Sequence, residues 1–365
     1  MKTLLSWFYG LVSFFRNLLY DEHVLYTYTP KIPTICVGNL AVGGSGKTPQ
    51  VEYLVTRLRA EGYQVAVLSR GYKRRTKGYI LADEQSVADT IGDEPRQYQL
   101  KFPDVPVAVS EDRAAGIRRL CKQFPELDVI ILDDAFQHRR VRCGLNILLT
   151  QADRLYVNDH LMPRGRLREA PHGANRADVV VVSKCPPTMR PIDRRVITTA
   201  LHCPTFQDLC FSSVIYEPVR PVFPDWAEAA RNIELAQEPD SDTLTSPSLK
   251  GLGGVFLLAG IAQPQYLIDH LGDSLVGQLL FADHHRYTQA DMNRLMQAVS
   301  QLDPSVLVLT TEKDAARLRD SAYVPDALKA RLYCQPIRVD FGADAEAFDR
   351  KVLRYVRENR RSAKK

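Results

Sequence analysis

A glycine-rich segment from Gly38 to Thr48, GNLAVGGSGKT, has the composition of a loop that holds phosphate groups. A β-branched run at 31–38 precedes it and an apolar pattern at helical spacing follows at 48–62, which predicts strand, loop and helix. In such loops backbone N–H groups face phosphate oxygens, the lysine reaches the β- and γ-phosphates, and the next hydroxyl binds magnesium. The strict pattern has glycine where this chain has Ala41. The candidate nucleotide-binding residues are Gly43, Gly44, Ser45, Gly46, Lys47 and Thr48.

Two acidic residues end a second apolar run, VIILDD, at positions 133 and 134. A phosphate-binding loop needs a carboxylate at the end of a neighbouring strand, which holds magnesium directly or through water. Asp133 and Asp134 are therefore candidate metal ligands. Either one can equally cap the following turn, so we expect one metal-facing carboxylate and one supporting carboxylate.

Phosphoryl transfer to an alcohol also needs a group that accepts the hydroxyl proton. IGDEP carries Asp93 and Glu94, and FADHHRY carries His284 and His285. Each cluster is a weak signal by itself, because GDEP is usually only a turn and paired histidines usually lie on a surface. Lys47 is a further candidate catalytic residue, since it stabilises charge on a transferring phosphoryl group.

The segment PRGRLREAP at 163–171 concentrates arginines and includes Arg168 and Glu169, while Arg113 follows an SED turn. Arginine binds phosphate oxygens in bidentate geometry. The same spacing is also typical of a solvated basic surface, which is the simpler interpretation.

Buried strand patterns alternate with helical patterns in the first half of the chain, which indicates an α/β fold with a P-loop NTPase-like, doubly wound parallel sheet. After about residue 205 this alternating pattern of strands and helices changes, and a second, smaller α/β unit is expected. We therefore expect a membrane-associated helix at 1–25, a kinase core at 26–205, and a smaller domain at 206–365 with a polar insertion near 225–252.

The first 20 residues place apolar side chains three and four positions apart, including Leu4, Phe8, Val12 and Phe15, with Trp7 and Tyr9 suited to the headgroup region. Arg16 interrupts the run, which is too short for a confident membrane span. We expect an amphipathic helix in the membrane interface; a helix packed on the protein's own core is the alternative.

Composition excludes few functions. Apolar residues make up 45% and charged residues 25%, as in soluble globular proteins, and the net charge of +5 is too small to indicate nucleic-acid binding. The seven cysteines are scattered without a C-x-x-C pair, as expected for a reduced cytoplasmic protein without structural zinc.

Seven segments in order resemble the tetraacyldisaccharide 4′-kinases of lipid A biosynthesis: GNLAVGGSGKTP, SRGY, GDEP, VIILDDAFQHR, PRGRLRE, FADHH and TTEKD, from residue 38 to 314. The resemblance covers most of the chain, and Ala135 and the insertion after residue 225 depart from the pattern. It implies ATP- and Mg²⁺-dependent phosphorylation of the 4′-hydroxyl of a tetraacylated glucosamine disaccharide 1-phosphate, giving lipid IVA for lipopolysaccharide. It also implies peripheral attachment to the cytoplasmic face of the bacterial inner membrane, with no nucleic acid and no obligate protein partner.

The resemblance implies a role for each matching site residue. It makes Asp93 the catalytic base, paired with His284, so that the pair would join the two expected domains. Lys47 and Thr48 would contact phosphate and magnesium. Arg113 and Arg168 would contact phosphates. Metal or supporting carboxylates would be Asp133, Asp134, Glu94 and Glu169.

Two other functions remain open from the residues. One is a kinase for a soluble metabolite, with the first helix packed internally. The other is a GTP-dependent switch, because SerLysCys at 183–185 and GluLysAsp at 312–314 are faintly similar to the Lys-x-Asp motif that reads guanine. ATP is preferred, since the first segment lacks the aspartate and the second lies in the other expected domain.

Overall fold

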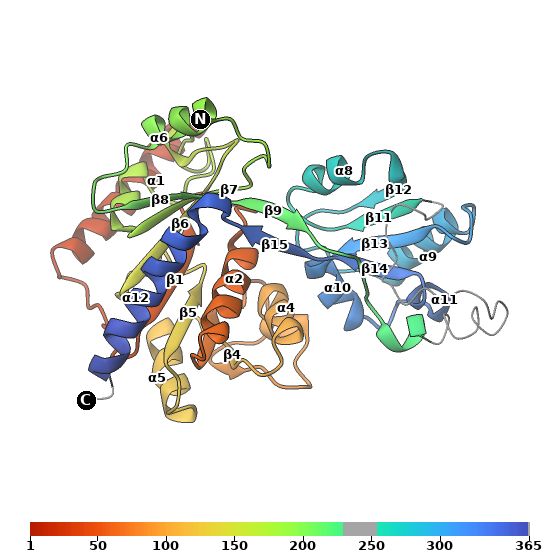
Figure 1. The fold of residues 1–365 in the computed structure, drawn as a ribbon, viewed down its shortest axis with the longest axis horizontal. Coiled ribbons are helices and arrows are strands. Elements are labelled where there is room, and N and C mark those ends of the chain that lie inside the picture. The colour runs from red at the N-terminus through yellow and green to blue at the C-terminus, as the bar shows by residue number, and fades with distance from the viewer. Residues whose placement is uncertain (229–253, 364–365) are drawn as a thin grey trace. The chain divides into compact units, whose positions relative to one another are not determined.

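The computed structural model describes residues 1–228 and 254–363, and the chain divides into two compact units (Figure 1). Unit 1 comprises Met1–Ser86, Lys101–Ile215 and Arg338–Lys365, and unit 2 comprises Val87–Leu100 and Tyr216–Ile337. Unit 1 continues ten residues past the expected boundary near residue 205, to Ile215, and two further segments also differ from the expected division. Residues 87–100 pack with the second unit, and the last helix packs with the first.

Unit 1 is built on an eight-stranded sheet in the order β3-β4-β2-β5-β1-β6-β7-β8, parallel except for β3. Strands β2 to β5 lie on one side of β1 in this order, and β6 to β8 lie on the other. The strand order therefore reverses direction between β5 and β6, and ligands of such sheets bind at this switch point, here at the carboxyl ends of β1, β5 and β6. The strands are β1 (Thr34–Asn39), β2 (Val65–Ser69), β3 (Ile80–Leu81), β4 (Val107–Val109), β5 (Val129–Asp133), β6 (Leu145–Gln151), β7 (Val179–Ser183) and β8 (Asp208–Phe211).

The central strands are buried along their whole length, which explains their continuous apolar sequences. Helix α2 packs on β1, β2 and β5 through Val51, Leu54, Val55 and Leu58, which recur at helical spacing. The α-helices of this unit are α1 (Lys2–Asp21), α2 (Lys47–Ala60), α5 (Arg113–Gln123), α6 (Pro191–Leu201) and α12 (Ala345–Ala363). The predicted doubly wound α/β fold is confirmed.

Unit 2 has its own five-stranded sheet in the order β10-β14-β13-β11-β12, with a separate core that includes Leu258, Met292 and Val308. Its strands are β10 (Arg220–Pro221), β11 (Val255–Ala259), β12 (Leu275–Leu280), β13 (Leu307–Thr311) and β14 (Leu332–Gln335). Its helices are α3 (Ala88–Ile91), α4 (Asp93–Lys101), α8 (Gln265–Leu271), α9 (Gln289–Val299), α10 (Glu312–Arg319) and α11 (Asp326–Lys329).

Two strands at the crossings between units pair with each other, β9 (Ser213–Tyr216) and β15 (Ile337–Asp340). The polar insertion expected near 225–252 lies, beyond Glu228, outside the described residues.

Candidate active site

The glycine loop connects β1 to α2, as the sequence predicts. Gly43 and Gly46 have φ angles of +115° and +84°, a region that glycine adopts without strain. Gly46 is the N-cap of α2, so the first N–H groups of the helix and its positive dipole end face the loop. This arrangement provides the donors and the partial positive charge that a phosphate group requires.

The loop is fastened to the ends of two neighbouring strands. Gln151 Nε2 at the end of β6 donates to the Gly44 carbonyl at 2.7 Å, and Ser183 Oγ at the end of β7 donates to the Ser45 carbonyl at 2.8 Å. Because these carbonyls are bound from the sheet side, the loop is held in shape before a ligand binds.

Lys47 and Asp134 form an electrostatic cluster beside the loop. Lys47 Nζ donates to Asn39 Oδ1 at 3.1 Å and lies 3.6 Å from Asp134 Oδ1, and Arg168 Nη1 donates to both Asp134 oxygens at 3.1 and 3.0 Å. Burial raises the pKa of Asp134, but Lys47 and Arg168 outweigh it and hold the pKa below its usual value. Asp134 therefore orients two cations that sequence reasoning assigned to phosphate binding.

Asp133 is the last residue of β5 and pairs in register with Val37 of β1. It is buried, and its Oδ2 accepts a hydrogen bond from Ser69 Oγ at 3.1 Å. Ser69 ends β2 and begins the SRGY segment. Asp133 thus lies at the strand end beside the glycine loop, and its carboxylate, with the Thr48 hydroxyl in the first turn of α2, is the oxygen donor set that Mg²⁺ prefers.

Arg113 is the first residue of α5 and is almost completely buried. Its Nη1 donates to the carbonyls of Ser110 and Glu111 at 3.2 and 3.4 Å. Burial lowers its pKa to about 10, while Asp134 and Asp133 oppose that shift. Arg113 therefore lies inside the protein, where its charge interacts with the carboxylates of Asp133 and Asp134.

Glu169, predicted as a metal or supporting carboxylate, is 3% exposed and engaged with side chains. Arg176 Nη2 donates to both of its oxygens at 2.8 and 2.9 Å, Gln137 Nε2 to Oε1 at 2.9 Å, and Asn17 Nδ2 to Oε2 at 3.0 Å. These contacts connect α1 to the loop of Arg168. They fit a supporting carboxylate and do not fit a metal ligand, because donors already occupy both oxygens.

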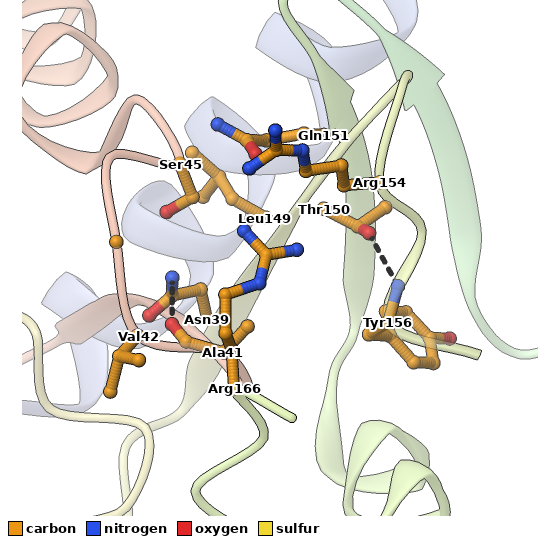
Figure 2. A pocket seen from close by; sticks show the side chains of 11 residues that line it. Asn39, Ala41, Val42, Ser45, Leu149, Thr150, Gln151, Arg154, Tyr156 and Arg166 are labelled. Atoms are coloured by element: carbon orange, nitrogen blue, oxygen red, sulfur yellow. Dashed lines mark hydrogen bonds between the residues drawn. The ribbon is translucent and has the colours of Figure 1, made fainter. Parts of the chain in front are cut away.

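The arginine segment runs beside the entrance to the glycine loop. Arg168 N donates to the Leu40 carbonyl at 2.7 Å, and Val42 N donates to the Arg166 carbonyl at 2.9 Å. A pocket opens here, and Figure 2 shows Arg166 and Arg154 extending into it. Asn39, Ala41, Val42, Gly43, Ser45, Leu149, Thr150, Gln151 and Tyr156 complete its lining. Arg154 was not identified as a candidate from the sequence, because it is a single arginine after β6 and belongs to no recognisable motif.

Asp93 and His284 lie together in unit 2. His284 Nδ1 is 2.5 Å from Asp93 Oδ2, although the residues are 191 positions apart. His284 has a φ of +62°, a strained value for a residue with a side chain, as functional sites often show. The predicted contact exists, but both residues belong to unit 2, because residues 87–100 pack there. The expectation that the pair joins two domains therefore differs from the observed division.

The Asp93 carboxyl is strongly stabilised in its charged form. Burial raises its pKa, but hydrogen bonds from His284 and Arg317 outweigh this and hold the pKa well below its usual value. A carboxylate held this way is a weak proton acceptor alone. The geometry favours a base formed by the pair.

Glu94 was predicted as a metal-site carboxylate, and ligand atoms of Asp93, Glu94 and His284 do lie within 4.8 Å of one another. A lysine ammonium already supplies the cation at this cluster. Lys313 Nζ lies 2.9 Å from Glu94 Oε1, 3.2 Å from Asp283 Oδ1 and 3.3 Å from His284 Nε2. Burial lowers the pKa of Lys313, but Glu94 and Asp283 outweigh it and raise the pKa. Glu94 therefore pairs with the Lys313 ammonium in this structure, and its role as a metal-site carboxylate stays a prediction.

Helix α1 docks through its polar and small side chains. Ser6 Oγ donates to the Leu161 carbonyl at 2.6 Å, Tyr9 Oη to the Arg168 carbonyl at 2.8 Å, and Asn17 to Glu169. Tyr9 thus faces the protein and not the expected headgroup region. The apolar side chains are 38–75% exposed: Leu4, Leu5, Trp7, Phe8, Leu11, Val12, Phe14, Phe15, Leu18 and Leu19. No helix in the described residues is long and apolar enough to cross a membrane.

A parallel α/β sheet with a glycine loop at its switch point and a lysine held beside an acidic strand end defines a P-loop nucleoside-phosphate-binding protein. A family model described as Tetraacyldisaccharide-1-P 4′-kinase matches residues 2–357. The chain therefore belongs to this kinase family, and the resemblance seen in the ordered motifs is confirmed.

Individual relatives agree with the family match. Tetraacyldisaccharide 4′-kinases of Bacteroides fragilis (strain YCH46) and Parabacteroides distasonis are 45% and 46% identical over 98% of this chain, covering 93% and 94% of those proteins. Among solved structures, LpxK from Aquifex aeolicus in complex with ATP is 27% identical with a TM-score of 0.71, covering 97% of this chain and 98% of that one.

Proposed function

We propose that this protein transfers the γ-phosphate of ATP to the 4′-hydroxyl of a tetraacylated glucosamine disaccharide 1-phosphate. The observation that carries the proposal is the preformed glycine loop with Lys47 held between Asn39 and Asp134. The names of the relatives supply the lipid, and the ATP complex of the Aquifex aeolicus protein supports the nucleotide.

In the proposed reaction the sugar hydroxyl oxygen attacks the γ-phosphorus, the bond to the ADP oxygen breaks, and the hydroxyl proton passes to the Asp93–His284 pair. The loop amides and Lys47 stabilise the charge on the transferring group. Thr48 and Asp133 would hold Mg²⁺, which neutralises phosphate charge when bound. The glycine loop belongs to unit 1 and the Asp93–His284 pair to unit 2.

The test is incubation of the full-length chain with radiolabelled ATP, Mg²⁺ and the tetraacylated disaccharide 1-phosphate. Label in a doubly phosphorylated lipid is expected, and Lys47→Ala should abolish most of it. Release of labelled phosphate without labelled lipid would contradict the assignment and favour a nucleotide switch. Unlabelled GTP should compete poorly with labelled ATP; strong competition would overturn the choice of nucleotide.

We also propose that α1 attaches the protein to the inner-membrane surface on its cytoplasmic side. Its polar face docks on unit 1 while ten apolar side chains face outward, an arrangement suited to burial in a bilayer interface. This pattern argues against a helix packed on the protein's own core, the feature expected for a soluble-metabolite kinase.

Membrane attachment is tested by Phe8→Ser with Phe15→Ser, which leaves the docking contacts in place. Both side chains are exposed, and burying each in lipid contributes about 1.5–3 kcal/mol. The variant should shift from the membrane pellet to the supernatant and need more lipid substrate with an unchanged requirement for ATP. The matched control is Ile192→Ser with Val196→Ser on α6, also exposed apolar residues of unit 1. Equal partitioning of both variants would contradict the anchor.

A further inference from the structure

The TTEKD segment forms the start of α10 in unit 2 and contains a buried charged pair. Asp314 is fully buried, and Arg317, one turn later, is nearly so. Charged side chains are rarely buried unless they are paired. Arg317 Nη1 donates to Asp314 Oδ1 at 2.7 Å, so the two residues satisfy each other.

Asp314 is itself fixed by its surroundings. Its Oδ2 accepts from the Gly260 backbone N–H at 2.9 Å and from Thr311 Oγ1 at 2.8 Å, and its own backbone N–H donates to Thr311 Oγ1 at 3.1 Å as part of the helix cap. Gly260 directly follows β11, so a strand end and a helix cap together hold this carboxylate. Asp314 is thus a rigid support for the Arg317 guanidinium.

The second terminal nitrogen of Arg317 reaches the candidate base. Arg317 Nη2 lies 2.5 Å from Asp93 Oδ2, the same oxygen that is 2.5 Å from His284 Nδ1. One guanidinium therefore holds the buried Asp314 through Nη1 and the Asp93 carboxylate through Nη2, two fixed donor positions that its planar fork provides and a single ammonium nitrogen does not. The other ring nitrogen, His284 Nε2, faces Lys313.

We propose that Arg317 is a positioning residue of this kinase: by bridging Asp314 and Asp93 it fixes the Asp93 carboxylate against Nδ1 of His284. The Nδ1–H then donates to Asp93, and Nε2 is presented as the acceptor side of the ring, because the partner of one nitrogen sets the tautomer of the other. The inference rests on the proposed function, in which the Asp93–His284 pair takes the hydroxyl proton.

A simpler role would be attachment of residues 87–100 to α10, and the structure offers a matched ion pair for that role. Arg96 of α4 lies 2.8 Å from Asp320 at the end of α10, and their side chains are 12% and 11% exposed, against 7% and 13% for Arg317 and Asp93. Arg96 thus joins the same two helices with similar burial but contacts Asp320 in place of the Asp93–His284 pair.

The experiment compares Arg317→Gln, Arg317→Lys and Arg96→Gln in the full-length chain by Tm, kcat and KM. Both Gln variants should lower Tm, but only Arg317→Gln should lower kcat, by about 10²-fold as expected for a displaced catalytic group, with KM for ATP unchanged. Arg317→Lys should stay well below wild-type kcat, since its single nitrogen cannot stand at the positions of both Nη1 and Nη2. Equal kcat losses for Arg317→Gln and Arg96→Gln would overturn the proposal, and so would wild-type kcat for Arg317→Lys if Arg317→Gln does not fold.

A second readout separates this inference from the proposed function. In ¹⁵N imidazole NMR, with His284→Ala as the assignment control, the wild-type His284 should show a protonated Nδ1, which is lost in the Arg317 variants and kept in Arg96→Gln. If the wild-type chain did not phosphorylate the lipid, the proposed function would be refuted. The NMR comparison would still decide whether Arg317 positions the Asp93–His284 pair. An unchanged His284 spectrum in the Arg317 variants would refute the positioning role.

Discussion

Replacing Glu169 separates the metal role suggested by sequence from the structural role indicated by its contacts. Glu169→Ala removes the buried acceptor of Arg176, Gln137 and Asn17. Breaking a buried ion pair from one side costs about 3–5 kcal/mol, and water reaches the Arg176 side chain, which is 25% exposed, so we expect about 3 kcal/mol. In domains of 150–250 residues each kcal/mol lowers Tm by about 2–4 °C, which predicts a decrease of about 6–12 °C.

The assay combines thermal denaturation of the full-length chain with Mg²⁺ titration of lipid phosphorylation, measured well below Tm. Glu169→Ala should keep the wild-type Mg²⁺ requirement, because its oxygens are occupied by protein donors. Asp104→Ala is the control: its side chain is 78% exposed and pairs at 3.4 Å with Arg59, which is 40% exposed, and such exposed pairs contribute about 0–1 kcal/mol.

A wild-type Tm for Glu169→Ala together with about a tenfold higher Mg²⁺ requirement would refute the structural role of Glu169. That result would make Glu169 a metal ligand whose protein contacts give way when the ion binds. A decrease in Tm no larger than that of Asp104→Ala would contradict a buried structural role for Glu169.

Lys47→Ala should lower kcat by about 10²- to 10³-fold with little change in Tm, because Lys47 stabilises transferring charge; near-normal turnover would discredit the glycine-loop assignment. Asp93→Asn and His284→Ala should each lower kcat strongly, and the double variant should be little worse than the more impaired single one; additive free energies would contradict a coupled base. Burial, helped by Arg113, lowers the pKa of His138 to about 4, whereas the unfolded chain binds that proton near pH 6.5. Stability should therefore fall as pH decreases from about 6.5 to 4, and His138→Gln should flatten that slope in denaturant titrations; parallel slopes would exclude His138 as a cause.

Local patterns predicted the elements around the glycine loop closely. The strand expected at 31–38 is observed as Thr34–Asn39, and the helix expected at 48–62 as Lys47–Ala60. Such buried strands and amphipathic helices are marked by periodicity, which a single sequence displays. Very short strands, such as β4 at Val107–Val109, span too few residues to show a period and were not anticipated.

Sequence alone determined the phosphate loop, Lys47 and the acidic strand end, because that chemistry lies within contiguous strand–turn–helix segments whose local conformation is set by their own residues. Tertiary structure decided what Glu169 contacts, which face of α1 docks, and how Arg317 joins Asp314 to the Asp93–His284 pair. The exposed apolar face of α1 shows the difference: the helical period was visible in sequence, but which face meets the protein depended on acceptors such as the Leu161 carbonyl. Contacts between residues far apart in the chain depend on the path of the backbone, and periodicity carries no information about that path.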